Sequence, residues 1–186
     1  MDEREEGLGL ASKWLVLMTL LAGAGLCLSG LLSYYAFVGH EFVRGERSDC
    51  NAVLYGVGGK FLDAMPLAML GMGAYIIVLI GLMLVGQSEG DGPRRLGWRI
   101  LLVMGVGLGG ASLWQMYLQM FEIGLWCVLC MVLNGMGLWL CYWVFGWMPR
   151  GQANGGLTGG GIVGGVLVGL LLLVGVIFGT YFVPSV

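Results

Sequence analysis

The chain has 186 residues, of which 58% are hydrophobic and 11% charged, with 36 glycines and a formal net charge of −2. Soluble domains carry about 25% charged residues, so this composition excludes a water-soluble globular enzyme. Its high hydrophobicity also excludes disorder. Its few basic residues are scattered, so they form no positively charged surface that could bind nucleic acid. The composition therefore predicts a polytopic protein of the lipid bilayer.

Five stretches contain the roughly 20 apolar residues that are needed to cross about 30 Å of hydrocarbon. They cover residues 12–37, 66–85, 100–120, 125–147 and 161–183. None alternates with period 2, and backbone groups in lipid must bond within their own segment, so we expect helices and an all-α fold. Residues 1–6 are acidic, unlike the start of a signal peptide, so we expect the first stretch to remain as a span.

The basic residues predict the orientation of these spans. Six would lie on one side and three on the other, the six being Arg4, Lys13, Arg94, Arg95, Arg99 and Arg150, and the three Arg44, Arg47 and Lys60. Loops rich in Lys and Arg stay in the cytoplasm. We therefore expect a multi-pass protein of the inner (plasma) membrane with its N-terminus in the cytoplasm.

The fifth stretch is set apart by a Gly-rich linker over residues 149–156. It carries Gly161, Gly165 and Gly169 at i, i+4 and i+8, a spacing that predicts a close-packing face for another helix. We therefore divide the chain into residues 1–148, with four spans, and residues 149–186, with the linker and the fifth span.

Five cysteines stand out in a chain with so few polar residues. Cys27 and Cys141 lie within spans, where a free cysteine usually behaves as a small hydrophobe. Cys127 and Cys130 lie at i and i+3 in the first turn of the fourth span, on one face of the helix. The partial positive charge of a helix N-terminus stabilises a thiolate, so the pair has the arrangement of a redox-active dithiol. The predicted orientation places the pair on the outer face, where disulfides form.

Cys50 lies in the first loop, which we expect on the same outer face. Three interpretations are open for these three cysteines. A structural zinc site would use them together with His40. A purely structural disulfide would attach the loop to the helix bundle of a non-catalytic scaffold. The residue pattern favours the third interpretation, thiol–disulfide catalysis.

The segment Tyr117-Leu118-Gln119-Met120-Phe121-Glu122-Ile123-Gly124-Leu125-Trp126-Cys127-Val128-Leu129-Cys130 resembles the junction of the third and fourth helices in the vitamin K epoxide reductase family. Cys50-Asn51-Ala52-Val53, residues 66–71 and Tyr75 resemble the loop cysteine and the second-helix entry of the same family. The resemblance covers residues 15–145, and a fifth helix is typical of bacterial members.

This resemblance implies a four-helix bundle around a quinone, ubiquinone or menaquinone, that opens toward the outer face. It implies that Cys130 faces the quinone and that Cys127 exchanges disulfides with a loop cysteine or a partner. Electrons would pass from a periplasmic thioredoxin-like dithiol protein to the membrane quinone and so support disulfide bond formation. No thioredoxin-like domain follows the fifth span, so we expect a separate partner.

The loop departs from the family pattern in two ways. The family normally carries two loop cysteines, and here Cys50 is alone, with Phe42 or a neighbour at the place of its mate. Gly56 stands where a serine or threonine is usual. These departures predict a shortened relay and favour disulfide formation over epoxide reduction.

Three residues near the pair are candidate quinone contacts, namely Trp126, Met131 and Asn134. An amide inside a membrane is costly unless it has a partner, so Asn134 is expected either to contact the quinone or to bond another helix. We expect Gln115 and Gln119, at i and i+4 in the third span, to form contacts between helices.

Overall fold

The computed structural model describes residues 2–38, 53, 60–61, 65–87, 91–148 and 157–181. These residues form α1 (Asp2–Val38), β1 (Lys60–Phe61), β2 (Met65–Pro66), α3 (Leu67–Gln87), α4 (Asp91–Tyr117), η1 (Leu118–Ile123), α5 (Val128–Trp147) and α6 (Gly159–Tyr181). The two-residue strands β1 and β2 pair antiparallel.

Five helices in the described part of the chain are long and apolar enough to cross a membrane, which confirms the predicted all-α polytopic fold. Two of them, α1 and α4, extend well beyond the apolar stretches from which they were predicted. The helix α4 begins at Asp91, not at residue 100, and it includes Arg94, Arg95 and Arg99. Polar residues can extend a helix beyond the hydrocarbon, so a length based on apolar residues underestimates the helix.

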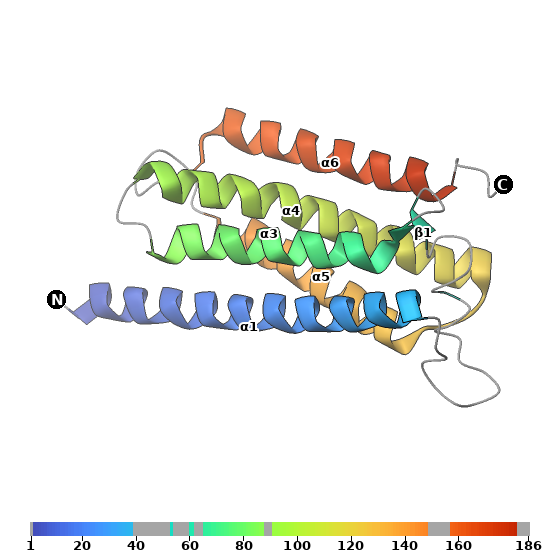
Figure 1. The fold of residues 1–186 in the computed structure, drawn as a ribbon. Helices are drawn as coiled ribbons and strands as arrows, with labels where there is room; N and C mark the ends of the chain where they lie inside the picture. Colours follow the sequence, from blue (N-terminus) through green and yellow to red (C-terminus); the bar gives the residue numbers. More distant parts are fainter. Residues whose placement is uncertain are drawn as a thin grey trace.

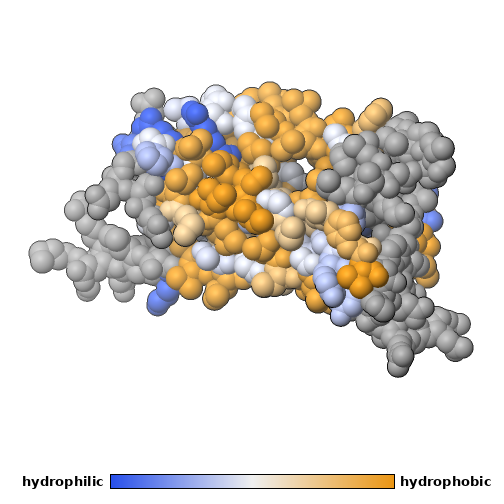
Figure 2. All heavy atoms as spheres, in the orientation of Figure 1, coloured by the Kyte–Doolittle hydropathy of each residue, from blue (hydrophilic) through white to orange (hydrophobic). Residues whose placement is uncertain are grey.

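Four of the helices form a closed bundle (Figure 1). The helix α1 packs against α3, α3 against α4, α4 against α5, and α5 against α1. The core lies between them and includes the buried side chains of Tyr75, Leu101 and Leu140. Hydrophobic side chains form a broad band along the molecule, and hydrophilic ones gather at the end where α4 begins (Figure 2).

The fifth helix, α6, lies outside this bundle and packs along α4 (Figure 1). A Cβ added at Gly165 would lie 2.6 Å from Cδ2 of Leu102, and one added at Gly169 would lie 2.7 Å from Cβ of Val106. Both distances are too short for a real Cβ. The predicted close-packing face is therefore confirmed at Gly165 and Gly169, and its partner is α4.

Candidate redox site and adjoining cavity

The turn between α4 and α5 sets the position of the cysteine pair. The helix α4 continues into the π-helical turn η1, which ends at Gly124 with φ 66°. Glycine occupies this left-handed region at little cost, and it is the usual residue after a helix end. The chain then runs extended to Cys127, the N-cap of α5, so α5 begins at Val128. The pair therefore lies at the opposite end of the bundle from the arginines of α4.

The sulfur of Cys127 caps the N-terminus of α5. The backbone N–H of Cys130 donates to Sγ of Cys127 over 3.2 Å. The backbone N–H of Met131 donates to the carbonyl oxygen of Cys127 over 2.9 Å. Sγ thus takes the place of the Ser or Asp oxygen that usually caps a helix, at the positive end of the helix dipole. Both the N–H group and the helix dipole interact favourably with a negatively charged sulfur.

Gln119 holds the backbone of the same turn. Its side chain is fully buried, and its Oε1 accepts a hydrogen bond from the backbone N–H of Cys127 over 3.3 Å. Gln119 belongs to η1, and π-helical turns are frequent at functional sites. The sequence predicted a contact between helices for this residue, and the structure gives it a specific partner in the backbone of the cysteine pair.

The pair packs against a residue of the first loop. Cys127 is fully buried, Cys130 is nearly so, and both pack against the buried side chain of Val53. The described part of the first loop therefore lies at the same end of the bundle as the pair. Cys50 and His40 lie outside the described residues. Within the described ranges, no group of three or more His, Cys, Asp and Glu residues is placed to hold a metal ion.

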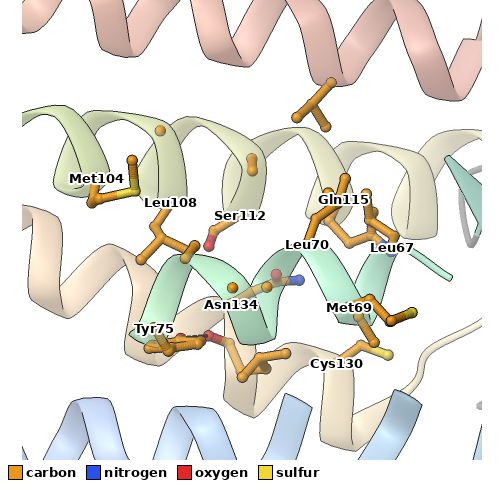
Figure 3. A pocket seen from close by; sticks show the side chains of 18 of the residues that line it. Leu67, Met69, Leu70, Tyr75, Met104, Leu108, Ser112, Gln115, Cys130 and Asn134 are labelled. Carbon is orange, nitrogen blue, oxygen red and sulfur yellow. Dashed lines mark hydrogen bonds between the residues drawn. The ribbon is translucent and has the colours of Figure 1, made fainter. Parts of the chain in front are cut away.

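A cavity of about 450 Å³ lies beside Cys130, among the five helices (Figure 3). Its walls are mostly leucine, alanine, methionine, glycine and valine. The polar residues in its lining are Tyr75, Ser112, Gln115, Cys130 and Asn134. Figure 3 shows these side chains of α3, α4 and α5 gathered around one space. Ligand pockets of this kind combine an apolar wall with a few polar groups.

Two amide atoms at the cavity have no hydrogen-bond partner among the described residues. They are Nδ2 of Asn134 and Oε1 of Gln115, and both atoms are buried. Asn134 is 8% exposed and lies one turn after Cys130. By contrast, the hydroxyl of Tyr75 donates to the carbonyl oxygen of Leu133 over 3.3 Å. Because an unpaired buried donor or acceptor costs about 1–3 kcal/mol, the cavity is suited to a ligand with its own polar atoms.

The other predicted site residues lie elsewhere. Trp126 is exposed and Met131 is half-buried, and neither is among the residues that line the cavity. The lining includes Tyr75, Ser112 and Gln115, to which the sequence assigned no ligand contact. The available signal was the presence of polar side chains in apolar spans, with Ser112 and Gln115 at i and i+3.

The two mid-span cysteines are separate from this site. Cys27 is exposed, Cys141 is half-buried, and both are free thiols that do not line the cavity. Cys141 packs against Gly109, where an added Cβ would lie 2.8 Å from its sulfur. Cys130, also a free thiol, is the cysteine in the cavity wall.

The comparison with curated proteins returned no match. The comparison with protein families matched the vitamin K epoxide reductase family over residues 16–145, which is 130 of the 186 residues. The matched region includes α3, α4, the cysteine pair, most of α1 and all but the last two residues of α5, and it ends before α6. Together with the five-helix membrane fold, this match shows that the chain belongs to the vitamin K epoxide reductase family.

Proposed function

We propose that this protein takes electrons from a periplasmic thioredoxin-like dithiol and passes them, through Cys127 and Cys130, to a membrane quinone. Membership of the family makes it a membrane thiol oxidoreductase that works with a quinone. The observation that carries the finer proposal is the position of Cys130. This cysteine belongs both to the capped pair at the N-terminus of α5 and to the wall of an apolar cavity that contains the unpaired Nδ2 of Asn134.

The residues of the cavity fit a quinone. Its volume of about 450 Å³ falls within the usual range for small-molecule pockets, roughly 300–1,000 Å³. A side-chain amide offers both a donor and an acceptor, so Asn134 and Gln115 can each pair with an oxygen of the ligand in its carbonyl or its hydroxyl form. A bound quinone would supply an acceptor for two electrons and two protons. The apolar walls keep water away from Cys130 during the transfer.

The two cysteines have different roles in this proposal. The partner dithiol reduces a Cys127–Cys130 disulfide, so the partner gains a disulfide and the chain gains two thiols. Cys127 is the exchanging sulfur, because the N–H of Cys130 and the helix N-terminus stabilise its negative charge as attacking or leaving group. Cys130 then releases the two electrons toward the cavity as the Cys127–Cys130 bond forms again and two protons leave.

Cys50 would carry the exchange between Cys127 and the partner. Cys127 is fully buried and belongs to the same packed cluster as Val53, so an external thiolate could reach it only after the surrounding residues move. Cys50 lies three residues before Val53, and three residues span at most about 11 Å of extended chain. This reach supports exchange between Cys50 and Cys127 within the chain, even without a second loop cysteine.

The predicted orientation belongs to the same proposal. The cysteine pair would face the outside of the inner membrane, and the arginines at the start of α4 would face the cytoplasm. A membrane-impermeant thiol reagent should label Cys50 on intact spheroplasts after reduction, while Cys141 stays unlabelled. Labelling of Cys50 only in broken membranes would reverse the orientation. The division into residues 1–148 for catalysis and 149–186 for the linker and fifth helix is also part of the proposal.

A comparison of two cysteine variants tests the proposed electron path. The full chain is purified in detergent, given dithiothreitol, and assayed for reduction of a short-tailed ubiquinone above the uncatalysed rate. Cys130→Ala should lose essentially all of this activity, and the matched variant Cys141→Ala should keep it. In Cys130→Ala isolated from cells without a reductant, disulfide mass mapping should find a Cys50–Cys127 bond or a mixed disulfide between Cys127 and the partner. Full activity of Cys130→Ala would refute the proposal.

The structural-disulfide alternative makes a different prediction in the same assay. A bond that only attaches the loop to the bundle should resist reduction by a glutathione pool, and the wild-type protein should then reduce no quinone. A reducible bond that forms again when ubiquinone is added would exclude this alternative.

A further inference from the structure

The fifth helix contributes to the cavity wall although it lies outside the four-helix bundle. Leu172, Leu173 and Val176 of α6 line the same cavity as Cys130 and Asn134. The family match ends at residue 145, before α6 begins. The cavity is therefore completed by a helix that the matched region does not contain.

The cavity opens to the side between α3 and α6. Ile77 on α3 and Leu172 on α6 both line it, and they are 39% and 47% exposed. Residues that both line a cavity and reach the surface mark its mouth. The exposed surface at this depth of a membrane-spanning helix faces hydrocarbon, so the mouth leads into lipid.

Two glycines leave space in the cavity. Gly73 on α3 and Gly107 on α4 belong to its lining, and a Cβ added to either would meet nothing within 4 Å. On α4, Gly107 lies between the residues that contact α6, Val106 and Gly110, and the residue Leu108 on the side of the bundle. At about 100° per residue, this places Gly107 on the α4 surface between α3 and α6. Bare backbone at these two points keeps the passage wide.

The cavity thus has a polar inner end and an apolar side opening. The inner end holds Cys130 and the unpaired Nδ2 of Asn134, and the opening is bordered by Ile77 and Leu172. A ligand that matches both ends has a small head with oxygen atoms and a long hydrocarbon tail. A membrane quinone has this construction, and its tail is too long to be enclosed in about 450 Å³.

We propose that α6 and α3 form a side passage through which the isoprenoid tail of the quinone extends into the bilayer, with Gly107 as its floor. This inference rests on the proposed function and adds a selection for tailed quinones. The bundle binds the ring, and α6 adds affinity through van der Waals contacts with the tail.

The test compares two quinones with the same ring, one without a tail and one with a long isoprenoid tail. Binding to the full chain in lipid nanodiscs is measured by quenching of tryptophan fluorescence. Gly107→Phe should raise the Kd of the tailed quinone about tenfold, because it removes van der Waals contacts between the tail and the passage, and should leave the Kd of the tail-less quinone within about twofold. The matched control is Gly164→Phe on α6. An added Cβ at Gly164 also meets nothing within 4 Å, but Gly164 does not line the cavity.

A second pair of variants tests the same passage in case Gly107→Phe does not fold. Leu172→Phe narrows the mouth from α6, and its neighbour Leu171 is 70% exposed and does not line the cavity. Leu172→Phe should weaken binding of the tailed quinone alone, and Leu171→Phe should weaken neither. Equal weakening of both quinones, or no effect on the tailed one, overturns the side passage alone. Failure of the wild-type chain to bind either quinone overturns the proposed function as well.

Discussion

Glycine serves opposite purposes in the contacts on the two sides of α4. Toward α6, Gly165 and Gly169 allow contact so close that an added Cβ would overlap Leu102 or Val106. Toward the cavity, Gly107 faces open space. Helices in lipid gain little from the hydrophobic effect and depend on close van der Waals packing. The side of α4 that packs against α6 therefore stabilises the fold, and the side that faces the cavity is less tightly packed and leaves room for a ligand.

The polar side chains of α4 also differ between the side that packs against α6 and the side that faces the cavity. The packed side of α4 meets α6 through apolar residues, whereas Ser112 and Gln115 lie on the side toward the cavity. Oε1 of Gln115 and Nδ2 of Asn134 are buried there without a partner in the described ranges. The cavity side therefore carries a cost in stability that ligand binding can offset. The four substitutions below test this contrast, from the largest expected effect to the smallest.

Gly169→Leu should have the largest effect, because it breaks the packed side of α4. An added Cβ would lie 2.7 Å from Cβ of Val106 and 3.0 Å from the backbone oxygen of Val103, which cannot move without shifting α4. Overpacking of this kind costs about 1–3 kcal/mol, so the thermal midpoint in detergent should fall by several degrees. Gly164→Leu, on an exposed part of α6, is the control and should unfold near the wild-type temperature.

Asn134→Leu should change stability and ligand binding in opposite directions. Removing a buried donor without a partner should stabilise the protein without ligand by about 1 kcal/mol. The same change removes one hydrogen bond to the ligand, so the Kd of a short-tailed ubiquinone should rise about tenfold. Thermal unfolding and ligand titration on one sample measure both effects. A loss of stability without ligand would mean that Asn134 serves the fold.

Gln119→Leu should slow thiol exchange without changing ligand affinity. It removes the acceptor for the N–H of Cys127, a bond worth about 1 kcal/mol, and loosens the turn that positions Sγ. The rate at which oxidised protein reacts with a dithiol should fall, while the Kd of ubiquinone stays within about twofold, because Gln119 does not line the cavity. Gln119→Glu keeps an acceptor oxygen and should recover much of the rate. An unchanged rate in Gln119→Leu would remove this residue from the mechanism.

Gly107→Ala should have the smallest effect and should favour the fold. One methyl group enters open space, and alanine is a better helix former than glycine by about 0.5–1 kcal/mol. A small rise in the thermal midpoint is therefore expected. Gly165→Ala, which would overlap Leu102, is the matched substitution on the packed side and should lower the midpoint. Equal shifts in the two variants would show that the two sides of α4 do not differ.

The sequence by itself determined the membrane fold, because hydropathy depends on local residue content and each span must satisfy its own backbone. It also indicated the family, through the spacing of Cys127 and Cys130 and the residues around them, and the match over residues 16–145 confirmed that indication. The close-packing face of α6 was readable from its glycine spacing. Its partner was not, because the same spacing fits any neighbouring helix.

Only the tertiary structure decided which side chains share the cavity. Trp126 and Asn134 were equal candidates in the sequence, yet Trp126 is exposed and Asn134 lines the cavity. Ser112 and Gln115 became part of the lining because α4 turns both toward the cavity, and Gly107 and Gly165 took opposite roles despite identical chemistry. Helix rotation and the choice of neighbour depend on contacts among all five helices at once, and no local pattern contains that information.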